Sequence, residues 1–144
     1  MHAQQINDAP ERTFALVLDP RDEVVAELER FAAAEGLAAS RLTAIGAFER
    51  VTLGYFDWER KDYLRIPVDG QVEVLSLVGD IALLDGRPKL HAHVVLGLRD
   101  GSTRGGHLLS ADVRPTLEVV LTDSPAHLRR VYDPASGLAL IGKR

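Results

Sequence analysis

The sequence predicts an α+β fold, a mainly antiparallel β barrel or sandwich with one principal helix. An amphipathic helical pattern occurs once, close to the start of the chain, and after it the apolar residues alternate as they do in strands. Turn-forming pairs such as Asp85-Gly86 and Asp100-Gly101 divide the later part into short, regularly spaced segments. Because helices do not alternate with these strands, the pattern excludes a βαβ series with a parallel sheet.

Composition limits the class of protein. The 144 residues, 46% of them hydrophobic and 26% charged, fit one globular domain, which we place at residues 11–144 after a flexible N-terminal leader at residues 1–10. The 17 basic and 21 acidic residues give a net charge of -4, which argues against nucleic acid as the main partner. Because the chain has no cysteine, any bound metal must be held by histidine, aspartate or glutamate.

The beginning of the chain carries no signal-peptide pattern. It lacks a basic start followed by an apolar run, and no later stretch approaches the ~18 apolar residues of a membrane-spanning helix. We therefore expect a soluble cytoplasmic protein without a membrane partner.

The first two elements follow from local patterns. Residues 13–18 form an apolar run that predicts a buried strand. A helix is expected next, with Asp19 as its N-cap, Pro20 at its first position and Gly36 at its end. Its apolar stripe faces the core.

Alternating segments then predict seven strands, at residues 42–48, 51–58, 63–68, 72–84, 90–98, 107–113 and 116–122. Turns are expected between them at residues 59–62, 69–70, 85–88 and 100–101. The last apolar segment, residues 128–141, can supply a return strand.

Three histidines are the clearest functional signal. His91 and His93 are two apart on a predicted strand, so their side chains share one face about 7 Å apart. His107 follows Gly105-Gly106, a pair that lets the backbone approach a site closely. Three neutral imidazoles with an open fourth position describe a zinc-type centre, although imidazole also suits nickel, copper and iron. The alternative is that these are polar strand residues that bind no ion.

Glu118 is the candidate acid/base residue. It interrupts the apolar run at residues 117–121, and a carboxylate that faced inward would need a partner. It would then orient a ligating imidazole or move protons at the metal. Alternatively, it faces water or forms a salt bridge.

Residues 31–42 have the alanine, glycine and serine placement of a helix-turn-helix. The second helix would have to run through Thr43, Ile45 and Gly46, which are poor helix formers, and it would present little positive charge to DNA. The sequence does not favour this interpretation.

Five segments together resemble a known family: Leu75-Ser-Leu-Val-Gly79, Gly86-Arg-Pro-Lys-Leu-His-Ala-His93, Asp100-Gly101, Gly105-Gly-His-Leu108 and Leu117-Glu-Val-Val-Leu121. The chain resembles the bacterial and archaeal PPC domain, named for its presence in plants and prokaryotes and also called the PD1-like DNA-binding domain or domain of unknown function 296. The similarity covers about residues 14–131.

The resemblance implies an antiparallel sheet with a helix, similar to the acetolactate decarboxylase fold, and a homotrimer. In that fold three histidines hold zinc, and the matching positions are His91, His93 and His107. Plant relatives carry a separate AT-hook for DNA. Gly86-Arg87-Pro88 spells the core of that hook, but Asp85 precedes it and no basic cluster surrounds it, so we interpret it as a turn.

The sequence is consistent with three alternative functions. The first is a trimeric ligand-binding or regulatory domain whose metal accepts a small anionic or carbonyl-bearing ligand. The second is a metalloenzyme for a small carbonyl or carboxylate substrate, with Glu118 handling protons. The third is a DNA-associated protein, as the family's older name suggests.

Overall fold

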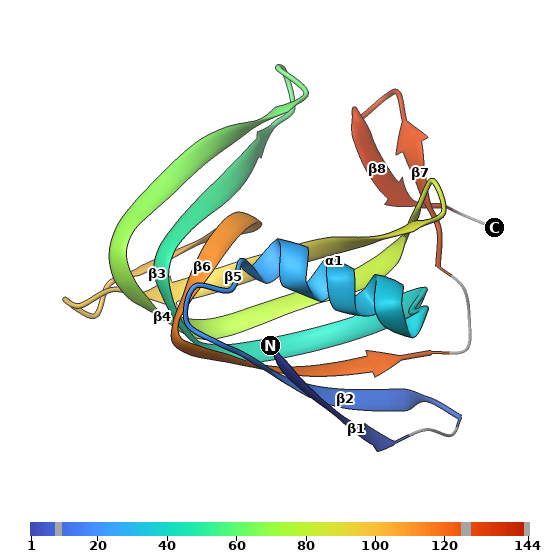
Figure 1. Ribbon diagram of the computed structural model, residues 1–144. Coiled ribbons are helices and arrows are strands. Elements are labelled where there is room, and N and C mark those ends of the chain that lie inside the picture. Colours follow the sequence, from blue (N-terminus) through green and yellow to red (C-terminus); the bar gives the residue numbers. More distant parts are fainter. Residues whose placement is uncertain (8–9, 125–127, 143–144) are drawn as a thin grey trace.

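The computed structural model describes residues 1–7, 10–124 and 128–142 of the chain (Figure 1). Within them the elements are β1 (His2–Asn7), β2 (Arg12–Leu18), α1 (Val24–Glu35), β3 (Ala39–Asp57), β4 (Asp62–Leu84), β5 (Arg87–Gly97), β6 (Thr103–Asp123), β7 (Arg130–Asp133) and β8 (Leu138–Ile141). The first six strands form one antiparallel sheet in the order β1-β2-β6-β3-β4-β5, and β5 also pairs with β6. The predicted α+β fold, mainly antiparallel with one principal helix, is confirmed.

Helix α1 begins later than predicted. Its N-cap is Glu23, whose side chain accepts a hydrogen bond of 2.7 Å from the Ala26 N–H. Asp19 belongs instead to a turn, because Arg21 has a φ of 76° and no helix can run through that conformation. The predicted end is confirmed, since Gly36 is left-handed at a φ of 66° and its N–H caps the last turn.

The sheet strands are longer than predicted because three pairs of expected strands are continuous. The turn expected at Asp69-Gly70 is wrong: Gly70, with a φ of 89°, lies inside β4, where the register with β3 shifts. One additional residue on one strand bends a ladder without reversing it, as β-bulges do. Likewise β3 spans the expected 42–48 and 51–58 segments, and β6 spans 107–113 and 116–122.

The turns at the other three places are present. Asp85 and Gly86 both have positive φ, 51° and 78°, as the two-residue hairpin between β4 and β5 requires. Gly101 has a φ of 82° between β5 and β6, and Lys61, at 50°, lies between β3 and β4.

The N-terminal segment differs from the expected leader. Residues 2–7 form β1, which pairs with β2 from His2 opposite Val17 to Asn7 opposite Thr13. Backbone pairing does not depend on apolar side chains, so a polar segment can cover the edge of β2. Hydropathy alone could not reveal this strand.

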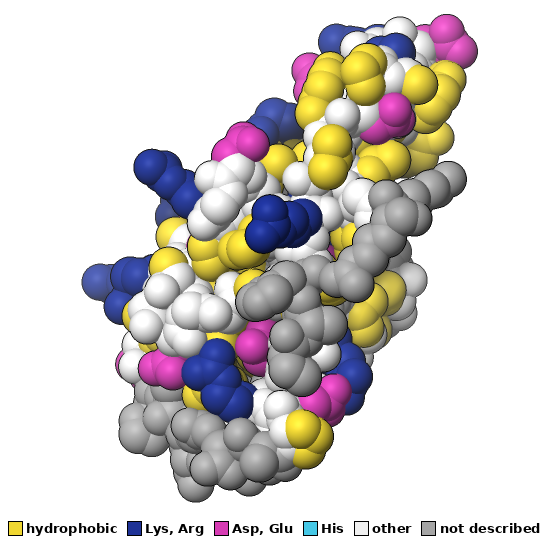
Figure 2. Space-filling model, turned by 90° about the vertical axis from the view of Figure 1, so that its right-hand side faces the viewer, with side chains coloured by type: hydrophobic (Ala, Val, Ile, Leu, Met, Phe, Trp, Pro, Cys, Tyr) yellow, Lys and Arg dark blue, Asp and Glu magenta, His cyan; other side chains and the backbone are white. Residues whose placement is uncertain are grey.

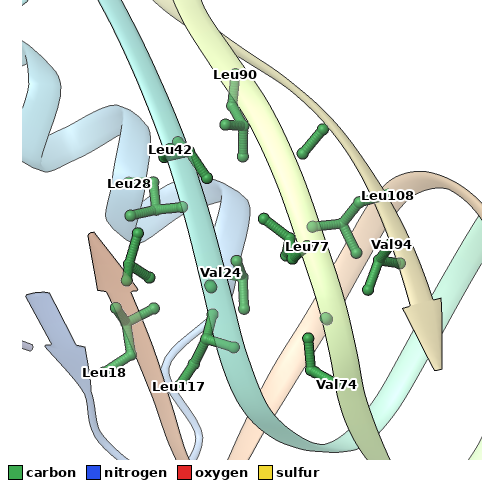
Figure 3. Close-up of a cluster of buried hydrophobic side chains, with 14 of the residues drawn as sticks. Leu18, Val24, Leu28, Leu42, Val74, Leu77, Leu90, Val94, Leu108 and Leu117 are labelled. Atoms are coloured by element: carbon green, nitrogen blue, oxygen red, sulfur yellow. The ribbon is translucent and has the colours of Figure 1, made fainter. Parts of the chain in front are cut away.

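The core lies between α1 and one face of the sheet (Figures 1 and 3). Figure 3 shows side chains from the helix, such as Leu28, pointing toward those of the strands, such as Leu77 and Leu117. All three are fully buried, and burial of each such side chain contributes roughly 1.5–3 kcal/mol. The opposite face of the sheet is the outer face, and it carries the histidines.

Strands β7 and β8 form a separate two-stranded hairpin, not a return strand of the main sheet. An isolated bridge between Leu83 and Arg129 and the Leu83 N–H bond to the Leu128 carbonyl connect it to the end of β4. Figure 2 shows hydrophobic side chains gathered at the upper end of the molecule, where this hairpin and the tip of the β3–β4 hairpin lie. Across the described segments of the chain, no helix has the length and apolar character needed to span a membrane.

Candidate metal centre

The three predicted histidines meet on the outer face of the sheet. His91 and His93 lie on β5, where Ala92 and Val94 between and after them are buried in the core. His107 lies on β6 directly opposite His93. The two strands therefore place one imidazole across from another, with the third two residues along the same face.

Their ring nitrogens converge. The Nε2 atoms of His91 and His93 are 3.3 Å apart, and one ligand nitrogen from each of the three histidines lies within 4.8 Å of the others. The ring centroids are 5.2 to 5.3 Å apart in all three pairs. The predicted grouping of His91, His93 and His107 is thus present in the structure.

This geometry fits a metal ion. With Zn–N distances of about 2.0–2.1 Å, two ligands of a tetrahedral ion lie roughly 3.3–3.4 Å apart. The His91–His93 separation of 3.3 Å matches that edge. In addition, the His107 Nδ1 is buried and has no hydrogen-bond partner among the residues that the structure describes. A buried polar nitrogen without a partner is costly, so this site favours a further ligand.

Glycines allow the strands to approach this closely. A Cβ on Gly106 would lie 2.9 Å from the Gly54 carbonyl oxygen, and one on Gly105 would lie 3.1 Å from the Val94 carbonyl oxygen. The predicted role of this pair in close approach is confirmed, although neither glycine has a positive φ. On β4, a Cβ on Gly79 would meet the His91 carbonyl oxygen at 2.6 Å.

A carboxylate that sequence reasoning missed lies beside the histidines. Asp80 is opposite His91 in the β4–β5 ladder, and its Oδ2 is 3.6 Å from the His91 Nδ1. Its Oδ1 accepts a hydrogen bond of 2.5 Å from the Arg130 Nη2. Burial alone would raise the pKa of Asp80, but His91 and Arg130 outweigh it and hold the pKa below its ordinary value. Asp80 is therefore a charged carboxylate that lies beside the Nδ1 of His91.

Tyr63 packs against His107. Its ring stacks on His107 with centroids 4.6 Å apart. Burial, followed by the proximity of His91 and His93, lowers the pKa of His107 to about 4, so this imidazole is neutral at physiological pH, as a metal ligand must be. Burial raises the pKa of the Tyr63 hydroxyl, which therefore remains a neutral hydrogen-bond donor.

A pocket of about 230 Å³ opens beside His91 and His107, between the sheet and the β7–β8 hairpin. We call it the His–Arg pocket. Its other polar lining residues are Tyr63, Lys89 and Arg130. Its apolar walls include Leu84, Leu90, Leu138 and Leu140.

Glu118 is not brought to the histidines. It is exposed on the outer face of β6, with Val17 on one side and Ile45 on the other as its ladder partners. Strands β3 and β4 lie between this part of β6 and the histidines of β5. Its neighbours in the ladder are apolar, and the carboxylate near the histidines is Asp80 instead.

The two DNA-binding motifs take other forms in the structure. Residues 31–42 are not a helix-turn-helix, since α1 ends at Glu35 and β3 begins at Ala39. Gly86 lies in the β4–β5 turn, as predicted for the sequence that resembles an AT-hook.

The family of the chain follows from its sequence match. The model of the Plants and Prokaryotes Conserved domain matches residues 5–125, nearly the whole chain. The chain belongs to this family. None of the curated proteins matches it.

Solved structures agree with this membership. A PPC protein from Pyrococcus horikoshii is 29% identical, with a TM-score of 0.87 over 99% of this chain and 96% of that one. A metal-containing protein from Archaeoglobus fulgidus is 34% identical, with a TM-score of 0.85 over 99% of this chain and 97% of that one. A candidate DNA-binding protein from Ralstonia eutropha JMP134 is 30% identical, with a TM-score of 0.85 over 91% of each chain.

The fold extends to a more distant enzyme. The α-acetolactate decarboxylase of Bacillus subtilis strain 168 is 14% identical, with a TM-score of 0.56 over 85% of this chain and 57% of the enzyme. This likeness concerns the fold alone, and it agrees with the predicted decarboxylase-like architecture of the PPC domain.

Proposed function

We propose that this PPC-domain protein is a metal-dependent ligand-binding domain in which His91, His93 and His107 hold one divalent ion, with zinc as the first candidate. The observation that carries the proposal is the 3.3 Å separation of the His91 and His93 Nε2 atoms, with the His107 ring beside them. The metal-containing relative from Archaeoglobus fulgidus supports it. When bound, such an ion offers an open coordination position that attracts an anionic or carbonyl oxygen.

The protein's own residues supply the rest of the site. Asp80 orients His91, Tyr63 packs against His107, and the His–Arg pocket gives a small ligand access to the open position. In metal sites, the ring nitrogen of a histidine that does not bind the metal commonly donates a hydrogen bond to a carboxylate, which orients the imidazole.

The test is elemental analysis of the purified, tag-free protein after zinc addition and dialysis. We expect about one metal ion per chain, and its loss in a His91→Ala, His93→Ala double variant. His127→Ala, which removes a histidine outside the trio, is the matched control and should retain the metal. Absence of metal in the unaltered protein would contradict the proposal.

We also propose that the domain works as a homotrimer. The outer face of the sheet exposes apolar side chains on neighbouring strands, where a lone soluble chain usually has polar ones. They are Val17, Ile45, Leu75, Val78, Val95 and Val120. Burial of this face against other copies of the chain would remove it from water, and closed rings are the common form of such assemblies.

DNA association is a second candidate, favoured by the name of the relative from Ralstonia eutropha JMP134. Binding of that kind depends on phosphate contacts, so it would survive removal of metal and weaken steeply with salt. A gel-shift or anisotropy titration between 50 and 200 mM salt, with and without a chelator, distinguishes it from ligand binding at the metal. The net charge of -4 favours the metal-dependent function.

A further inference from the structure

We propose that the His–Arg pocket binds a short carboxylic acid with an apolar tail, and that Arg130 is the residue that binds its carboxylate. The inference rests on the proposed function, because it assigns the class of ligand that enters beside the three histidines. Arg130 lies at the start of β7 and lines the pocket together with His91 and His107.

The first support is an unsatisfied nitrogen of Arg130. Within the described part of the chain, two buried side-chain nitrogens have no hydrogen-bond partner, the His107 Nδ1 and the Arg130 Nε. Both belong to residues that line this one pocket. Since buried polar atoms are nearly always paired in folded proteins and the His107 nitrogen belongs to the proposed metal centre, the Arg130 Nε is the atom that indicates a polar ligand in the pocket.

The second support is that Arg130 is fixed in place before any ligand arrives. Its side chain is only 6% exposed, its Nη2 donates to Asp80, and its Nη1 donates to the Ala139 carbonyl oxygen at 3.0 Å. A guanidinium held in this way loses little freedom on binding, and its planar set of donors suits a carboxylate.

The third support is the charge balance of the site. Arg130 is paired with Asp80, and Lys89 is paired with Glu29 through an N···O distance of 3.0 Å. The charges of these four side chains cancel. A divalent ion held by three neutral histidines would therefore leave a local charge of about two positive units in this partly buried site. An anionic ligand offsets that charge, and a cationic one would add to it.

The apolar walls and the size restrict the anion. Leu84, Leu90, Leu138 and Leu140 line the pocket, so a ligand that fills it must be largely apolar beyond its charged end. A volume of about 230 Å³ corresponds to roughly eight atoms at the ~30 Å³ that a water molecule occupies in the liquid. Inorganic phosphate would offset the positive charge of the site but leave the apolar walls of the pocket exposed to water.

The test is calorimetric titration of the zinc-loaded protein with 3-methylbutanoate, its neutral analogue 3-methylbutanamide, and inorganic phosphate. We expect 3-methylbutanoate to bind at least ten times more tightly than either of the other two. Arg130→Gln should weaken its binding at least tenfold, and Arg130→Lys should weaken it less because the charge remains. Arg129→Gln, which removes the exposed neighbouring arginine, is the matched control and should bind as the unaltered protein does.

Arg130→Gln also breaks the ion pair with Asp80, so melting temperature is measured for every variant. Leu138→Trp gives an independent test, because it fills the pocket from the hairpin side and leaves all charges in place; it should abolish binding. Zinc content is measured in parallel.

If the unaltered protein holds no zinc, the proposed function is wrong. If zinc is held but Leu138→Trp or folded Arg130→Gln binds 3-methylbutanoate normally, or phosphate binds as tightly, this inference is overturned.

Discussion

Asp80 lies directly opposite His91 in the β4–β5 ladder, with its Oδ2 3.6 Å from the His91 Nδ1 and its Oδ1 bonded to Arg130. The His91 Nε2 therefore points toward His93 while its other nitrogen faces a carboxylate. One aspartate thus connects the metal ligands to the arginine of the neighbouring pocket. The relationship makes Asp80 the first residue to test beyond the histidines.

Asp80→Asn should weaken zinc binding about 10- to 100-fold. The substitution removes the negative charge that orients the His91 ring and increases the basicity of its imidazole. Competition with a chromophoric chelator measures this affinity. Asp85→Asn is the matched control, because Asp85 lies in the β4–β5 turn at a positive φ that asparagine also tolerates. Equal zinc affinity of Asp80→Asn and the unaltered protein would show that Asp80 has no role in the metal site.

The register that builds this site could have been predicted from two turns. A two-residue turn at Asp85-Gly86 pairs Leu84 with Arg87, and counting back along both strands places Asp80 opposite His91. Likewise, the turn around Asp100 places His93 opposite His107. Both turns and the three histidines follow from local sequence patterns, whereas Asp80 is found only by following the register of the β4–β5 ladder.

Other features could not be predicted in this way. Arg130 is 50 residues from Asp80 and reaches it only through the packing of the β7–β8 hairpin, which no local pattern specifies. The predicted placement of Glu118 at the metal is wrong for a related reason. Strand alternation can indicate which face of the sheet Glu118 occupies, but only the strand order shows that β3 and β4 separate it from the histidines of β5. Gly70 also shows that a turn-forming pair can instead occupy a bulge within a strand.

Gly106→Ala should destabilise the protein by about 1–3 kcal/mol and lower its zinc content, because the added Cβ would lie 2.9 Å from the Gly54 carbonyl oxygen. The strands must separate to admit it, and His107 is the next residue. Urea unfolding and elemental analysis measure the two effects. Gly86→Asn is the control, since no atom lies within 4 Å of a Cβ there and asparagine tolerates its φ of 78°. Normal zinc binding by Gly106→Ala would contradict the role of close strand approach.

The metal-free protein should lose stability as the pH falls from about 6.5 toward 4. The pKa of His107 is about 4 in the folded chain, where burial and the other two histidines disfavour its charge, and near 6.5 in the unfolded chain. Between these values the unfolded state binds the proton and the folded state does not, so protonation favours unfolding. His107→Phe keeps a ring against Tyr63 but removes the titration, and should flatten the pH dependence. Urea midpoints at pH 7.5, 5.5 and 4.5 test this, and parallel curves for both proteins would refute it.

Ile45→Glu should convert the proposed trimer to monomers. Ile45 is 61% exposed at the centre of the outer face, opposite Glu118 in the β3–β6 ladder, so the substitution places a second carboxylate beside the first on an apolar surface. Burying two unpaired like charges between subunits costs much more free energy than leaving them in contact with water. Light scattering at micromolar concentration measures the mass, with Ile141→Glu on β8 as the control that adds the same charge elsewhere. A trimer that persists in Ile45→Glu would place the interface on another surface, and a monomeric unaltered protein would exclude the trimer.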